Sequence, residues 1–385
     1  MTGPSGEQIE PFKPLEVLSG PPPEARPGTG PPVRDLGGGH HAVTFLWQGD
    51  AAQVLVLVNT VSEGQRHDPG PMLMERLPGN GGWHRTFRFP SDLRATYQFH
   101  PSDGPVDTAD PESWARVRRG AVPDPLNPET LPSWIPGVTT SVLELPGAPP
   151  QPWRDARPGV PRGTVTAHLV PSAALGTART VHVYVPAGPV ESPDLLVLLD
   201  GGLWAETVPI APTLDNLIAE GLVPPMVALM PASGDAAVRD AELGGDEPFL
   251  AFLTGELPRW APRHWPVTAD PARSTIAGQS LGGLTAAAAA LRAPGRFGNV
   301  LAQSGAFWLD GEALTRASAG SPPPRVRFYL EVGRNEWRLR PAVRRFRDML
   351  RAHGRDVAFT EYGGGHDLAC WRGGLADGLL ALAHR

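Results

Sequence analysis

The chain has 385 residues, a formal net charge of −6, and hydrophobic residues at 41% of its positions. This length is too great for one ordinary domain and suits two, and the apolar fraction supports a sizeable core. A negative charge without any block of basic residues argues against binding to nucleic acid. The single cysteine, Cys370, excludes an internal disulfide.

Neither a membrane span nor the core of a signal peptide is expected, because no run of 18 apolar residues occurs and the amino-terminal residues are polar and rich in proline. We therefore expect a cytoplasmic protein without a membrane partner. No spacing of His, Cys and Asp is typical of a metal site, so we expect no metal and no cofactor. The oligomeric state is left open.

The first 163 residues read as three segments. Residues 1–38 carry repeated Pro and Gly without periodicity, which predicts a disordered tail. Residues 39–103 contain short aromatic and β-branched runs separated by turns, which predict a small β-sandwich of the immunoglobulin type. These runs are 41–47, 53–59, 83–89 and 95–100. Residues 104–163 are punctuated by proline and predict a connector that packs on the surface and overhangs the active site.

From residue 164 to 385, strand patterns alternate with helix patterns. The expected strands are 181–185, 195–199, 227–230, 275–277, 300–303 and 326–332, with another strand-like run at 357–362. The expected helices are 213–220, 248–260, 284–292, 341–353 and 371–384. Such alternation indicates an α/β domain whose mostly parallel sheet is covered on both faces.

The segment Gly278-Gln-Ser-Leu-Gly-Gly283 joins a β-leaning run to an alanine-rich helix. A G-x-S-x-G pattern in this context is typical of the nucleophile elbow of an α/β-hydrolase. The tight turn requires glycine at 278 and 282, because Cβ atoms there would collide with neighbouring chain. Ser280 is therefore the candidate nucleophile, at the amino end of a helix where backbone N–H groups steady an oxyanion.

A serine hydroxyl needs a base, and the chain order in this fold is Ser, acid, His. His366, on the glycine-rich segment 363–367, is the candidate base. Glu336 follows a predicted strand and is the preferred acid, since the acid must orient the imidazole. Glu331, within that strand, and Asp367, adjacent to the histidine, are the other carboxylates considered.

The oxyanion hole needs two backbone donors. The N–H of Leu281, directly after the nucleophile, is one of them. The other is expected from the loop after the strand that ends at Asp200, where Gly201 and Gly202 let the backbone approach a substrate closely. The sequence does not separate these two glycines.

Four segments of the carboxyl-terminal half resemble the enterochelin (enterobactin) esterases, which belong to the esterase D branch of the α/β-hydrolases. They are residues 199–206, 277–284, 302–308 and 364–375, of which the last covers the histidine, Cys-Trp-Arg and the start of a helix. Residues 41–47, 82–83 and 124–128 are similar to the amino-terminal part of the same enzymes. The resemblance thus covers roughly residues 40–385.

This resemblance implies a serine esterase that opens the trilactone ring of ferric catecholate siderophores, with iron present only inside the substrate. Ser280, His366 and Glu336 match the positions of nucleophile, base and acid. A ferric tris-catecholate is a large planar anion, for which arginine and tryptophan are suitable partners. The candidate substrate-binding residues near the catalytic loops are Arg239, Trp204, Arg334, Trp308, Trp371 and Arg372, with Arg338 and Trp337 also close in sequence.

Two alternatives remain open. One is an esterase D relative that acts on another acyl ester, such as a feruloyl or acetyl-sugar ester, with the β-sandwich as a carbohydrate-binding module. The other is a non-catalytic siderophore-binding protein on a hydrolase scaffold. An intact elbow argues against the second, because a binding protein does not need an exposed serine.

Overall fold

The structure is a computed structural model that describes residues 12–23, 28–79, 82–135, 137–320 and 325–383. Of the tail expected over residues 1–38, positions 1–11 and 24–27 lie outside the described residues. The described remainder differs from the expectation, because it contains two strands, β1 (Glu16–Leu18) and β2 (Val33–Gly37). Both strands are held in a sheet by pairing with later strands.

The N-terminal unit, residues 12–145, contains two antiparallel sheets. One sheet has the order β1-β6-β3-β2 with β5 paired to β6, and the other has the order β4-β7-β9-β8. The remaining bounds are β3 (His40–Gln48), β4 (Gln53–Val58), β5 (Glu75–Arg76), β6 (Gly82–Pro90), β7 (Arg94–Ser102), β8 (Thr130–Pro132) and β9 (Thr139–Glu144), with helices α1 (Val61–Gln65) and α2 (Pro111–Arg119).

The two sheets of the N-terminal unit enclose one apolar core. Phe45 of β3 and Tyr97 of β7 meet there edge to face, with ring centroids 4.9 Å apart. Strands β8 and β9 lie in the segment that we expected to be a connector, and β9 pairs with β7. The expected boundaries at residues 39 and 103 are therefore too narrow, because pairing partners distant in sequence complete both sheets.

The hydrolase unit, residues 164–383, is built on an eight-stranded sheet of order β10-β11-β13-β12-β14-β15-β16-β17. Strands β10 and β11 are antiparallel to their neighbours, and the strands from β13 to β17 are parallel. The bounds are β10 (Thr164–Ser172), β11 (Thr177–Val185), β12 (Asp194–Leu198), β13 (Met226–Pro231), β14 (Ser274–Gln279), β15 (Asn299–Gln303), β16 (Arg327–Gly333) and β17 (Val357–Tyr362).

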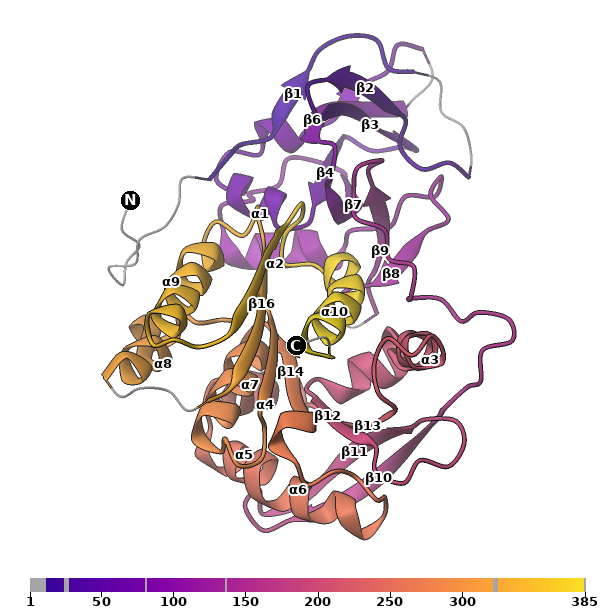
Figure 1. Ribbon diagram of the computed structural model, residues 1–385. Helices are drawn as coiled ribbons and strands as arrows, with labels where there is room; N and C mark the ends of the chain where they lie inside the picture. The colour runs from indigo at the N-terminus through magenta and orange to yellow at the C-terminus, as the bar shows by residue number, and fades with distance from the viewer. Residues whose placement is uncertain (1–11, 24–27, 80–81, 136, 321–324, 384–385) are drawn as a thin grey trace.

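Helices cover both faces of this sheet, as expected for an α/β-hydrolase (Figure 1). Alternate side chains of β12 enter opposite cores: Val197 belongs to the core that includes residues of α7 and α9, whereas Leu196 and Leu198 belong to the core that includes residues of α3 and α10. The bounds are α3 (Ala211–Ala219), α4 (Ala236–Leu243), α5 (Glu247–Ala251), α6 (Leu257–Trp260), α7 (Leu281–Arg292), α8 (Leu309–Gly320), α9 (Leu339–Ala352) and α10 (Leu368–Ala383).

The N-terminal unit contacts the loops that follow β16 and β17, at the carboxyl ends of the parallel strands. Arg94 N donates to the carbonyl oxygen of Gly363 over 2.8 Å, and the guanidinium of Arg334 pairs with Asp92. In open parallel sheets this edge is where ligands bind. The N-terminal unit therefore lies against the edge at which a site is expected.

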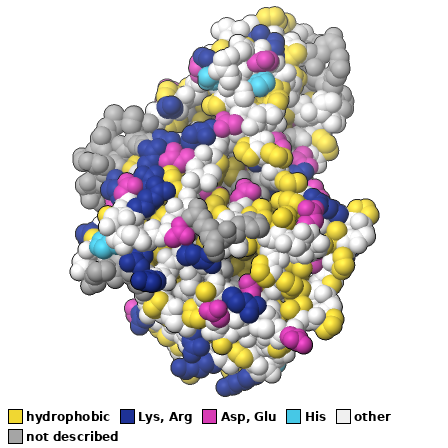
Figure 2. All heavy atoms as spheres, in the orientation of Figure 1, with side chains coloured by type: hydrophobic (Ala, Val, Ile, Leu, Met, Phe, Trp, Pro, Cys, Tyr) yellow, Lys and Arg dark blue, Asp and Glu magenta, His cyan; other side chains and the backbone are white. Residues whose placement is uncertain are grey.

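Basic side chains gather on the side of the molecule where α9 lies, as Figure 2 shows. Several of them are paired with acids, for example Arg344 with Glu361 and Arg345 with Glu312. These pairs neutralise part of the positive charge of this helix. Across the described ranges, no helix combines the length and apolar character that crossing a bilayer requires.

Candidate active site

Ser280 occupies a strained turn between β14 and α7, with φ of 57° and ψ of −121°. A Cβ at Gly278 would lie 2.5 Å from the carbonyl of Gly282, so a side chain at 278 is excluded. Position 282 differs from our expectation, because a Cβ there would have only ordinary contacts at 3.6 Å. The turn brings the backbone of Gly282 close to residue 278, and this contact does not depend on the absence of a side chain at 282.

The backbone of Ser280 is anchored by the last residue of β15 and by the chain that follows it. Its N–H donates to the carbonyl oxygen of Gln303 over 3.0 Å, and its own carbonyl accepts from Ala306 N over 2.9 Å. No side-chain cap occupies the start of α7. The serine is thus presented at a helix amino end by a backbone that has little freedom to relax.

His366 and Glu336 are joined by a hydrogen bond of 2.7 Å between Nδ1 and Oε2. Glu336 is fully buried, and its other oxygen accepts from Gly333 N at 2.7 Å, Ser304 Oγ at 2.6 Å and Tyr362 OH at 3.1 Å. A proton on Nδ1 donates to Glu336 and leaves Nε2 free to accept one. This is the arrangement that a general base requires.

The other two carboxylates do not contact the imidazole. Glu331 accepts from Gln303 Nε2 at 2.6 Å and from Tyr329 OH at 2.9 Å, and burial raises its pKa to about 8. Asp367 accepts from the N–H and the hydroxyl of Thr96 at 2.6 and 3.0 Å. Burial also raises the pKa of Asp367. Of the three acids considered, the geometry pairs only Glu336 with His366.

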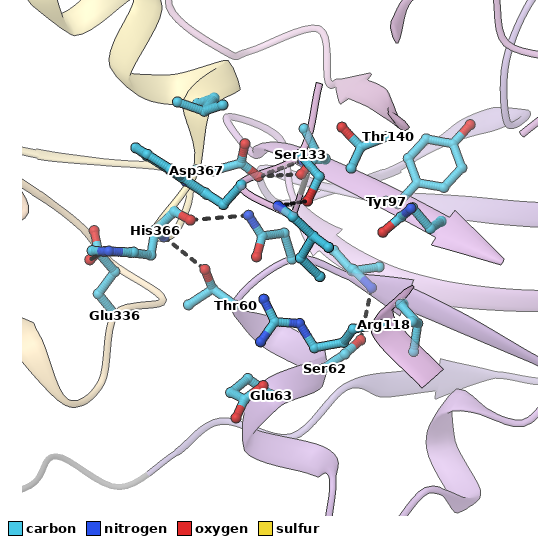
Figure 3. Close-up of a pocket in the computed structure, with 18 of the residues that line it drawn as sticks. Thr60, Ser62, Glu63, Tyr97, Arg118, Ser133, Thr140, Glu336, His366 and Asp367 are labelled. Carbon is cyan, nitrogen blue, oxygen red and sulfur yellow. Dashed lines mark hydrogen bonds and ion pairs between the residues drawn. The ribbon is translucent and has the colours of Figure 1, made fainter. Parts of the chain in front are cut away.

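The N-terminal unit holds the main chain of His366 (Figure 3). Thr60 Oγ1 accepts from His366 N over 2.7 Å, and Asn59 Nδ2 donates to the carbonyl oxygen of His366 over 3.0 Å. Thr60 itself has φ of 67° and ψ of −47°, a conformation that a β-branched residue rarely adopts. Both units therefore contribute to the position of this imidazole.

The loop after β12 lies beside the start of α7, because a Cβ at Gly282 would be 3.6 Å from Asp200 Oδ2. A Cβ at Gly201 would overlap the carbonyl of Met230, whereas a Cβ at Gly202 would meet no atom within 4 Å. Packing against β13 thus explains the glycine at 201. Within the described residues, the amides of Leu281 and Gly201 have no hydrogen-bond acceptor, so both are available as donors.

Arg239 holds this loop, and its side chain is largely buried. Its guanidinium donates to both oxygens of Asp200, over 2.6 and 2.8 Å, and lies 5.4 Å from the ring centroid of Trp134. Ser233 Oγ adds a third bond to Asp200 at 2.7 Å. Two of the five guanidinium donors fix the loop in this way, and the substrate-binding role expected for Arg239 stays a prediction.

Trp204 and Trp371 are wrong as substrate-binding residues, because both are almost fully buried. Trp204 Nε1 donates to Gln279 Oε1 over 2.9 Å, beneath the elbow. Trp371 Nε1 donates to Ser304 Oγ over 3.0 Å, and its ring lies edge-on to His366 with centroids 4.6 Å apart. They support the catalytic loops from the interior.

Arg372 and Arg334 also have structural partners. Arg372 is buried and bonds to Gln151 and Glu129 at 3.0 and 3.2 Å, so its expected contact with substrate is wrong. Arg334 pairs with Asp92 across the two units. Trp308, by contrast, is 37% exposed two residues after Ala306, which bonds to Ser280, so its placement remains compatible with substrate binding.

A cavity of about 300 Å³ adjoins His366 between the two units. Arg118 and Thr60 come from its N-terminal wall, and His366 and Glu336 come from the opposite wall (Figure 3). The sequence did not point to Arg118, Thr60 or Trp134 as site residues, because no local motif marks them. Trp337 and Arg338, which we noted only for their proximity in sequence, also line this cavity. In the described ranges, no group of three or more His, Cys, Asp and Glu residues could hold a metal ion.

Comparison with known proteins agrees with this architecture. Residues 172–382 match a family described as "Putative esterase", and residues 42–154 match the enterochelin esterase N-terminal family. An iron(III) enterobactin esterase from Dickeya dadantii is 34% identical over 93% of this chain and 91% of the relative. The match therefore extends over both units.

Two solved structures have the same overall fold. The ferric enterobactin esterase of Salmonella typhimurium superposes with a TM-score of 0.84 at 32% identity, over 92% of this chain and 96% of that chain. The enterobactin esterase of Shigella flexneri, solved in the presence of 2,3-dihydroxy-N-benzoyl-serine, has a TM-score of 0.80 at 30% identity, over 92% and 96%.

Proposed function

Because this chain belongs to the enterochelin esterase family, we propose that it hydrolyses the trilactone esters of ferric catecholate siderophores such as enterobactin. The chain is a carboxylic-ester hydrolase, and its relatives are named for iron(III) enterobactin. The observation that carries the proposal is the 2.7 Å bond between His366 and buried Glu336 in a chain with a strained serine elbow. The iron belongs to the substrate.

In the acylation step, Ser280 Oγ attacks an ester carbonyl while His366 Nε2 takes its proton. The negative charge of Glu336 stabilises the imidazolium that forms. The amides of Leu281 and Gly201 donate to the oxyanion, and Arg239 keeps the second donor in place by holding Asp200. Collapse of the tetrahedral intermediate then transfers the proton from His366 to the leaving alkoxide.

In the deacylation step, water attacks the acyl-enzyme and His366 accepts one of its protons. Collapse of the second tetrahedral intermediate returns a proton to Ser280 and releases a carboxylate. Each turnover opens one ester, so a trilactone gives a linear trimer first, then a dimer and a monomer. We place this reaction in the cytoplasm, and fractionation of cells followed by immunoblotting checks that assignment.

The experiment that tests the function is mass spectrometry of iron-loaded enterobactin after incubation with the protein. Linear trimer, dimer or monomer is the expected product. The Ser280→Ala variant is the control, and its rate should fall on the order of 10⁶-fold because the nucleophile is absent.

Other outcomes separate the substrate from the chemistry. Intact trilactone beside rapid hydrolysis of p-nitrophenyl butyrate would reject the substrate and retain the serine esterase. Failure of a fluorophosphonate probe to label Ser280 in folded protein would reject catalysis and favour a binding protein. Labelling that disappears in Ser280→Ala supports the assigned nucleophile.

A further inference from the structure

The cavity beside His366 is formed by both units, although only the hydrolase unit carries the proposed catalytic residues. We propose that it is a subsite for one aryl-amide arm of the substrate, with oxygens of that arm facing Arg118 and Arg338. This inference rests on the proposed function, since it assigns a place to part of the same substrate. It makes the N-terminal unit a direct contributor to substrate selection.

The size of the cavity matches one arm better than the whole substrate. A cavity of roughly 150 Å³ is enough for a benzene molecule. The cavity here is about 300 Å³, which accommodates a substituted benzoyl group with its amide. A three-armed siderophore with its iron is several times larger, so the remaining arms must lie outside this space.

Two arginines of the cavity have donors that can bind oxygens of an arm. Its three acids have partners: Glu63 accepts from Trp114 Nε1 at 2.7 Å, while Glu336 and Asp367 accept from His366 and Thr96. Arg118 and Arg338 are exposed, and neither has an acidic partner among the residues that the structure describes. Their guanidinium donors are therefore available to ring oxygens, for which the planar fork of arginine is well suited.

Aromatic rings line the same space and suit a flat ligand. Trp134 is 37% exposed, and the guanidinium of Arg338 lies 4.7 Å from the ring centroid of Trp337. Trp134 also contacts Arg239, which holds the loop of the proposed oxyanion hole. An arm in the cavity thus lies beside His366 and Trp134.

The test is calorimetric titration of the full-length Ser280→Ala protein with 2,3-dihydroxy-N-benzoyl-serine. Adding Arg118→Ala or Arg338→Ala should weaken binding about tenfold, because each removes a charge-assisted hydrogen bond. Arg119→Ala is the matched control, since this exposed arginine neighbours Arg118 on α2 and does not line the cavity. It should bind as the parent protein does.

The second measurement is the ratio of kcat/KM for iron-loaded enterobactin to kcat/KM for p-nitrophenyl butyrate in variants with Ser280 intact. Arg118→Ala should lower this ratio about tenfold, and Arg119→Ala should leave it unchanged. Absence of probe binding, or equal binding by the Arg118 variant and its parent, would overturn the subsite. Binding that weakens in Arg118→Ala supports the subsite even where the trilactone is not cleaved, so the two proposals fail separately.

Discussion

Replacement of Thr60 by glycine should lower kcat without lowering stability. Thr60 lies at the centre of a γ-turn, in which Val61 N donates to the carbonyl oxygen of Asn59 over 2.8 Å, and its φ is 67°. This conformation is strained in a β-branched residue. The hydroxyl of this strained residue accepts a hydrogen bond from His366 N. The strain is therefore located at a residue that supports the proposed catalytic loop.

The effects on stability nearly cancel. Glycine relieves about 1–3 kcal/mol of backbone strain. Against this, the variant loses one hydrogen bond, worth about 1 kcal/mol. Glycine also gives the unfolded chain more conformational entropy, which lowers the stability of the fold by about 0.5–1 kcal/mol. The free energy of unfolding should therefore change by between about −1 and about +1.5 kcal/mol. The imidazole loses one of its main-chain anchors, and misplacement by about 1 Å costs roughly 100-fold in rate.

The assay is the hydrolysis of p-nitrophenyl butyrate, with thermal unfolding measured on the same samples. Thr60→Gly should lower kcat about 10- to 100-fold at nearly unchanged KM and Tm. Thr60→Ser keeps the hydroxyl and should retain the rate, whereas Thr60→Val keeps the shape and should lose it. The reasoning is refuted if the serine variant is as slow as the glycine variant, or if loss of rate follows loss of Tm.

Three further predictions concern buried groups. Glu336→Gln should lower kcat by about 10⁴-fold with the fold retained. Because three donors meet Oε1, the amide oxygen of the glutamine would take that position and its nitrogen would face His366 Nδ1. The imidazole would then be held in the wrong tautomer. Circular dichroism beside a rate measurement checks this, and near-normal activity would contradict it. Gly201→Ala should lower both Tm and kcat, because the new Cβ would overlap the carbonyl of Met230; Gly202→Ala is the matched control with open space. Glu331→Gln should raise Tm at pH 8 and leave it unchanged at pH 4. The pKa of Glu331 is about 8 in the folded protein and has its ordinary value of 4.5 in the unfolded chain. The stability that protonated Glu331 gives the fold is therefore fully present below pH 4.5 and is lost as the pH rises to 8. The gain is on the order of a few kcal/mol, and equal Tm values at pH 8 would argue against a raised pKa.

Features that depend on neighbours in sequence were predictable. The elbow is one of them, because the collision that excludes a side chain at Gly278 involves residue 282, only four positions away. The strands from β11 to β17 follow from local periodicity, as do most helices between them, whereas α4 and α8 were not expected. His366 and Glu336 were found because each follows a strand at the edge where this fold assembles its catalytic residues.

Features that depend on distant partners were not predictable. Strands β8 and β9 were assigned to a connector, since nothing local indicates that β9 pairs with β7. Tryptophans near the motifs were expected to bind substrate, but Trp204 and Trp371 are buried, whereas Trp134, from the supposed connector, lines the cavity.

The amino-acid sequence by itself determined the serine turn, the alternation of strands and helices, and the family to which the chain belongs, because these follow from short-range sterics and from motifs. Only the tertiary structure decided which arginines remain unpaired, which tryptophans are exposed, and that Thr60 supports His366 from 306 positions away. The physical reason is that burial and pairing are properties of surfaces that meet only after the two units have packed together.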